Sequence, residues 1–169
     1  MRRHLKWVVT LGFFLQSGCA TLSEVTPAER MAMQTQVFEN TSYENVFQSF
    51  KTVLQDDGYL IKNQDQGGGF IVASVDKNDK ASSFFAAING SPQYRSGDGF
   101  ELSINLERVT NTTIRARTTI QRVERYSLGS QEGEEVLEPT IYRNFYDMVR
   151  VEVAHRGALG SNLEGKGIR

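Results

Sequence analysis

Phe100-Glu-Leu-Ser-Ile-Asn-Leu-Glu107 and Ile114-Arg-Ala-Arg-Thr-Thr-Ile-Gln121 are two neighbouring stretches, separated by six residues, from which the fold can be inferred. Along each stretch, the residues that suit a protein interior alternate with polar residues. This period of two is typical of β-strands that have one buried and one solvated face. Because the connection between the two stretches is short, we expect them to form an antiparallel hairpin.

The register of this hairpin follows from its two faces. A slip of one residue would turn every side chain to the opposite face, so the apolar sets of both strands must pair with each other. Pairing Leu106 with Ala116 satisfies this condition and leaves residues 110–112 as the loop. The same register places Glu107 opposite Arg115 on the solvated face, a cross-strand pair that contributes about 0.2–1 kcal/mol.

The residues before this hairpin predict a strand, a helix and another hairpin. Residues 34–38 have β character. A helix should follow, with a Thr41-x-x-Glu44 capping box at its start and Gly58 as its left-handed C-terminal cap. Its apolar stripe recurs at helical spacing and comprises Val46, Phe47, Phe50, Val53 and Leu54. Two strands come next, at residues 59–63 and 70–75, joined by a glycine-rich turn.

The residues after the hairpin of residues 100–121 predict a loop and a second helix. Residues 127–136 are polar and contain two glycines, which favours a loop. Pro139 suits the first turn of a helix, and His155 and Arg156 suit its last turn before Gly157. The apolar stripe of this helix comprises Ile141, Phe145, Met148, Val149 and Val153. Residues 157–169 have little to bury and predict a disordered tail.

The order of these elements predicts a single α+β domain over residues 33–156. We expect an antiparallel sheet of four to five strands in the order β-α-β-β-β-β-α. An irregular insert, residues 77–99, should separate the third strand from the fourth. Neither helix can bury its stripe alone, so both should pack on one face of the sheet. The opposite face carries polar residues and should be open to solvent.

The N-terminus has the three parts of a bacterial secretory leader. Arg2, Arg3 and Lys6 precede nine largely apolar residues, 7–15, and Gln16-Ser17-Gly18-Cys19 follows. Nine residues span about 14 Å as a helix, too short for a bilayer core of about 30 Å. The last segment resembles the lipobox of lipoprotein precursors, which places the signal peptide at residues 1–18. Gln16 departs from the Leu that is usual there.

This resemblance implies a lipid on Cys19 and a tether over residues 19–32. Ala20 after the cysteine implies the outer membrane, facing the periplasm, if the host is Gram-negative. Two alternatives are a plain secretory signal with a chance cysteine and a cytosolic protein with an apolar start. A protein that loses residues 1–18 keeps 16 basic and 20 acidic residues, a formal charge of −4. That acidic balance argues against general nucleic-acid binding.

The mature chain offers few residues for catalysis or metal binding. Its only histidine is His155, and Cys19 is its only cysteine, so neither a histidine-based zinc site nor a Cys–His pair is available. No serine lies in a Gly-x-Ser-x-Gly motif. The sequence therefore predicts a protein without catalytic residues, metal or cofactor.

Two features of the sequence suit binding. The insert carries four apolar or aromatic residues, Phe84, Phe85, Ile88 and Tyr94. They would contact a partner or a ligand, or else pack back on the sheet as a lid. The second feature is the polar sheet face, with Glu101, Glu107, Arg115 and Arg117. This face is either a binding surface or a solvated surface whose charges neutralise one another.

Residues 46–75 resemble a family of uncharacterised bacterial lipoproteins. The shared pattern is a helix ending in Leu54-Gln-Asp-Asp-Gly-Tyr59, a strand, and then Gly69-Phe-Ile-Val-Ala-Ser74. Glu138-Pro-Thr-Ile-Tyr142 is similar to the start of their C-terminal helix. More distantly, the architecture resembles the helix-grip domains of a lipoprotein component of the β-barrel assembly machinery.

The expected lipid tether and the lack of a catalytic constellation together predict a non-enzymatic, lipid-anchored envelope protein that acts as an interaction or accessory module, with an envelope protein as partner. The alternative is a periplasmic domain that binds a small molecule or lipid beneath the insert of residues 77–99.

Overall fold

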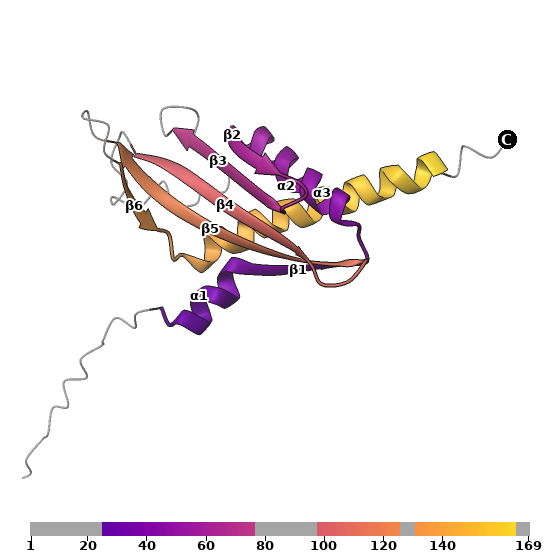
Figure 1. Cartoon of the computed structure of the whole chain (residues 1–169), viewed down its shortest axis with the longest axis horizontal. Helices are drawn as coiled ribbons and strands as arrows, with labels where there is room; N and C mark the ends of the chain where they lie inside the picture. Colours follow the sequence, from indigo (N-terminus) through magenta and orange to yellow (C-terminus); the bar gives the residue numbers. More distant parts are fainter. Residues whose placement is uncertain (1–24, 77–97, 126–130, 165–169) are drawn as a thin grey trace, which may run out of the picture.

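The structure is a computed structural model that describes residues 25–76, 98–125 and 131–164. Over these residues the chain is an α+β protein with an antiparallel sheet of six strands and with three helices (Figure 1). Along the chain the elements are α1 (Pro27–Gln34), β1 (Thr35–Glu39), α2 (Tyr43–Asp56), β2 (Leu60–Asp65), β3 (Phe70–Asp76), β4 (Asp98–Arg108), β5 (Thr113–Arg125), β6 (Gln131–Glu135) and α3 (Pro139–Glu164). The predicted fold class is therefore confirmed, with more strands and one more helix than expected.

The long strand β5 organises the sheet. The strand order is β1-β5-β4-β3-β2, and β6 also pairs with β5. β1 pairs with residues 113–117 of β5, whereas β6 pairs with residues 121–125. Because β4 takes the other edge of β5, β1 and β6 lie one after the other along the same edge. A gap at residues 118–120 separates them.

The predicted register of the β4–β5 hairpin is confirmed. Leu106 pairs with Ala116, and Glu107 pairs with Arg115. The apolar set of each strand is buried, as its alternation requires: Phe100, Leu102, Ile104 and Leu106 on β4, and Ile114, Ala116 and Ile120 on β5. We call this buried side of the sheet the inner face and the opposite side the outer face.

Helices α2 and α3 pack against each other and cover the inner face. Figure 1 shows them side by side, with α3 running on beyond the strands toward the C-terminus. Phe50 of α2 is fully buried, and its ring centroid lies 5.8 Å from those of Phe38 on β1 and Phe145 on α3. The two helices and the sheet therefore share one core.

Helix α2 starts one residue later than the sequence predicts, and it ends where the sequence predicts. Its N-cap is Ser42, whose Oγ accepts a hydrogen bond of 3.1 Å from the backbone N–H of Asn45. The predicted cap, Thr41, instead accepts a hydrogen bond from the side-chain amide of Asn45. Either residue has the hydroxyl that a cap needs, so the sequence favours both. Gly58 has a φ of +86°, as expected for a left-handed cap.

The glycine-rich turn between β2 and β3 has a packing reason. Gly69 has a φ of +76°, and a Cβ atom there would lie 2.3 Å from the carbonyl oxygen of Leu106. The two backbones meet because Leu106 donates a hydrogen bond to the carbonyl of Gly69. Only glycine combines this φ with so close an approach.

Helix α1 corrects the tether predicted over residues 19–32. Residues 27–34 are helical, so residues 27–32 belong to a helix and not to an extended tether. Thr26 and Glu29 form a capping box, and Pro27 occupies the first turn. These are strong start signals, but the helix is only eight residues long and lacks a buried apolar stripe.

Two further corrections concern β6 and α3. Residues 131–135 pair with β5 instead of forming part of the predicted loop of residues 127–136, and an Arg122–Glu134 ion pair joins the two strands. Helix α3 continues to Glu164, so residues 157–164 are helical where a disordered tail was predicted. Gly157 does not take the left-handed conformation of a cap. A single glycine costs a helix only about 1 kcal/mol relative to alanine, so it does not stop one that is anchored by its neighbours.

Candidate functional site

The outer face of the sheet carries a pocket beside α1, which we call the α1 pocket. Its volume is about 710 Å³, and its lining residues are Ala28, Met31, Ala32, Thr35, Asn105, Glu107, Arg115 and Arg117. The α1 side chains form an apolar wall, whereas those from β4 and β5 form a polar floor. The pocket is thus amphipathic.

The strand register fixes the floor of the α1 pocket. Arg117 pairs with Thr35 on one side and with Asn105 on the other. Glu107 pairs with Arg115 in the next position on the same face. Because residues two apart on a strand share a face, all these side chains project from the outer face.

The two arginines of the pocket have different electrostatic surroundings. Nη2 of Arg115 lies 2.5 Å from Oε2 of Glu107, and this ion pair neutralises the guanidinium. Arg117 instead donates a hydrogen bond of 3.2 Å to the amide Oε1 of Gln34. Among the described residues, Arg117 forms no ion pair with a carboxylate. Within the part of the chain that the structure describes, the pocket therefore presents one guanidinium whose charge is not compensated by a carboxylate.

Gln34, at the junction of α1 and β1, holds Arg117 in place. Its side chain is only 1% exposed. Its Nε2 donates to Oε1 of Glu135, and its backbone carbonyl accepts from the hydroxyl of Tyr146. Glu135 in turn forms a 3.2 Å ion pair with Arg30 of α1. These contacts join α1, β1, β6 and α3, so the guanidinium of Arg117 is attached to a fixed support.

Two tyrosines of α3 occupy the gap between β1 and β6. Tyr142 accepts a hydrogen bond of 3.3 Å from the backbone N–H of Ile120, a strand residue without a neighbouring strand on that side. Burial raises the pKa of Tyr142 and raises that of Tyr146 further. Both hydroxyls therefore stay protonated at neutral pH. The hydroxyl of Tyr142, together with the backbone N–H of Val136 that donates to the carbonyl of Ile120 at 2.9 Å, completes the hydrogen bonds of β5 at Ile120.

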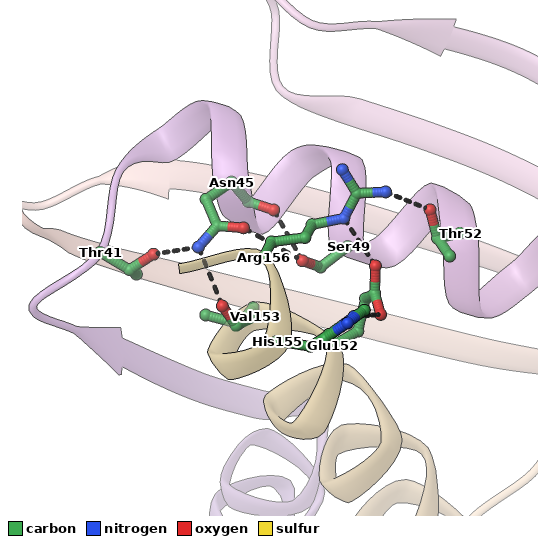
Figure 2. Close-up of polar contacts among 8 residues, drawn as sticks. All are labelled: Thr41, Asn45, Ser49, Thr52, Glu152, Val153, His155 and Arg156. Carbon is green, nitrogen blue, oxygen red and sulfur yellow. Dashed lines mark hydrogen bonds and ion pairs between the residues drawn. The ribbon is translucent and has the colours of Figure 1, made fainter. Parts of the chain in front are cut away.

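The α2–α3 junction is a second polar cluster, shown in Figure 2. The side-chain amide of Asn45 donates to Oγ1 of Thr41 and to the backbone carbonyl of Val153, at 3.1 and 3.0 Å. Arg156 donates to Glu152 at 2.7 Å and to Thr52 at 2.6 Å. The polar groups of this cluster are satisfied by hydrogen bonds to one another. Such an arrangement suits a structural junction that attaches the later turns of α3 to α2.

His155 lies at the rim of this junction. Its side chain is largely exposed, and its Nδ1 lies 3.5 Å from Oε2 of Glu152, which also binds Arg156 through its other oxygen. The imidazole faces no second acid or base among these contacts. The contacts of His155 therefore suit a structural role at α3.

The sequence-predicted site residues divide into two groups. Glu107, Arg115 and Arg117 come together at the α1 pocket, and Glu101 lies on the outer face of β4, six residues before Glu107. Cys19, Phe84, Phe85, Ile88 and Tyr94 lie outside the described residues. Sequence reasoning missed Gln34 and the apolar wall of α1. The Thr26-x-x-Glu29 capping box was the signal that could have revealed this helix.

The described residues, 25–76, 98–125 and 131–164, contain neither a candidate metal site nor a candidate membrane span. No cluster of three or more His, Cys, Asp and Glu side chains there could hold a metal ion. No helix in the same ranges is both long enough and apolar enough to cross a membrane. Neither a protein-family model nor a curated protein matches this chain.

Proposed function

We propose that this chain is a lipid-anchored protein of the bacterial cell envelope that acts as a non-enzymatic interaction or accessory module at the outer membrane. The α1 pocket carries this proposal. It combines an apolar wall with a cation that is held in place and has no carboxylate partner among the described residues. Arginine is enriched among the residues that dominate binding energy at protein interfaces. The outer face is therefore the surface that we assign to interaction.

The N-terminal leader supports the anchoring part of the proposal. Cys19 is the only cysteine of the chain, and it follows directly on the segment that resembles a lipobox. Several acyl chains on one residue anchor a protein stably, because each buried methylene contributes about 0.8 kcal/mol. Val25 is the sixth residue after Cys19, a distance of about 20 Å at full extension. An anchor there would keep α1 and its pocket close to the membrane.

The two faces of the sheet support the interaction part. The inner face is occupied by α2 and α3. On the outer face, Ser103 and Asn105 of β4 and Gln121 of β5 are exposed. A surface of this kind makes contacts without needing a bound cofactor.

The anchor is tested by replacing Cys19 with Ala in the full-length chain. Growth with labelled palmitate should label the wild-type protein and leave the variant unlabelled. The wild type should sediment with the outer-membrane fraction, and the variant should be released or retained as a precursor. Absence of label from the wild type, with unchanged fractionation of the variant, would contradict the proposal.

A further inference from the structure

We propose that the α1 pocket receives the phosphate of a membrane phospholipid, with Arg117 as the cation and α1 lying in the headgroup layer. This inference rests on the proposed lipid anchor at Cys19 and names the partner of the same site. It places one end of the outer face against the membrane in which the chain is anchored.

The charge of the pocket suits a single phosphate. Arg115 is neutralised by Glu107, whereas Arg117 has no carboxylate partner among the described residues. A guanidinium presents a planar fork of N–H donors that matches the oxygens of a phosphate. Gln34 uses one of those donors and fixes the group, which leaves the remaining N–H groups of Arg117 for a ligand.

The apolar wall of the pocket suits the boundary between headgroups and acyl chains. Met31 is 56% exposed, and Ala28 and Ala32 are exposed beside it. Val37, on the outer face of β1, is also 43% exposed. Apolar side chains next to a cation are the combination found on proteins that lie at a membrane interface.

The length of chain before α1 favours a lipid over a distant partner. From Cys19 to Val25 the chain spans at most about 20 Å, and α1 begins two residues later at Pro27. Of the described elements, α1 is the nearest in sequence to the anchor. β2 lies at the edge of the sheet opposite β1 and therefore away from α1, so a probe on β2 can serve as the control for a probe on α1.

The inference is tested on the lipidated full-length protein in vesicles of phosphatidylethanolamine and phosphatidylglycerol. The lipid blocks Cys19, so Met31→Cys supplies a single thiol for an environment-sensitive fluorophore. Lys62→Cys, exposed on β2, is the matched control. The probe at position 31 should emit at shorter wavelength and be quenched by a nitroxide lipid labelled in the headgroup. The probe at position 62 should remain in water.

A second substitution tests the role of the cation. Arg117→Gln, in the Met31→Cys background, should remove most of the quenching at position 31, whereas Lys62→Gln should leave it unchanged. Circular dichroism should show both variants folded. Quenching that survives Arg117→Gln in a folded protein would overturn the phosphate assignment.

The outcomes also separate this inference from the function on which it rests. Mass spectrometry that finds no lipid on Cys19 would contradict the proposed anchor. A lipidated protein whose position 31 stays in water, as position 62 does, would overturn the inference alone. Shielding of position 31 in native membranes but not in pure lipid vesicles would also overturn it and point to a protein partner. Added inorganic phosphate that binds without any vesicle-dependent quenching would show a free anion rather than a lipid as the ligand.

Discussion

The two faces of the sheet differ in what they contact. On the inner face, Phe50 is fully buried among Phe38, Phe145 and Tyr146. On the outer face, the side chain of Glu107 is 59% exposed and that of its partner Arg115 is 50% exposed. Burial of large apolar side chains stabilises a fold strongly, whereas exposed ion pairs contribute little. Stability therefore depends mainly on the inner face, and the side chains of the outer face can serve binding instead.

The greatest loss of stability should follow from a substitution on the inner face. Phe50→Ala removes a ring that contacts β1 and α3 at once, and it should lower the free energy of unfolding by about 3–5 kcal/mol. Urea denaturation followed by circular dichroism measures this loss. Ser103→Ala, on the exposed outer face, is the control and should change stability by no more than about 0.5 kcal/mol. Equal losses for the two variants would remove the distinction between the faces.

A smaller loss of stability is expected when a buried hydrogen bond is removed. Tyr146 donates a hydrogen bond to the carbonyl of Gln34, and Tyr146→Phe should lower the free energy of unfolding by about 1–3 kcal/mol because that buried carbonyl loses its partner. Arg143→Ala, at an exposed position on the same helix, serves as the control. An unchanged free energy of unfolding in Tyr146→Phe would show that this bond does not hold the junction of α1 and β1.

The same tyrosine gives a pH dependence of known sign. Burial raises the pKa of Tyr146 in the folded protein above the ordinary value of about 10. The unfolded chain therefore loses its proton first, and stability that is fully present below about pH 10 is lost as the pH rises above it. Urea denaturation at about pH 8 and about pH 11 should show this loss, and Tyr146→Phe should reduce it. An identical loss in the variant would assign the effect to other groups.

The smallest contribution to the free energy of unfolding is expected from the ion pair on the outer face. A double-mutant cycle of Glu107→Gln and Arg115→Gln should give a coupling energy of about 0.2–1 kcal/mol, since the two side chains are exposed. The coupling should decrease when the salt concentration is raised. A coupling as large as the loss caused by Phe50→Ala would contradict the view that this face contributes little to stability.

The elements that follow from local pattern were predictable from the sequence. Alternation along 100–107 and 114–121 determined the faces and the register, and Gly58 marked the end of α2. β6 was not predictable, because Gln-Glu-Gly-Glu-Glu has no apolar alternation and depends on the neighbouring β5 for its pairing. Helix α3 continues past Gly157, and just before that residue Val153 and Arg156 hydrogen-bond to α2, tertiary contacts that the local sequence does not contain.

The candidate site was predictable only in part. Glu107, Arg115 and Arg117 follow from the alternation of two adjacent strands. The support of Arg117 does not, because Gln34 lies 83 residues away in the chain, and its bond to Tyr146 spans 112 residues. A single glutamine at the end of a short helix carries no pattern that indicates such contacts. Tertiary packing alone brings these residues together.

The proposal that the outer face is an interaction surface can be tested by site-specific photocrosslinking in living cells. Benzophenone at Ser103, on the outer face, is compared with benzophenone at Gln55, exposed on α2. We predict a discrete adduct with an envelope protein or phospholipid at position 103 and none at position 55. Equal labelling at the two positions, or an adduct at position 55 alone, would contradict the claim.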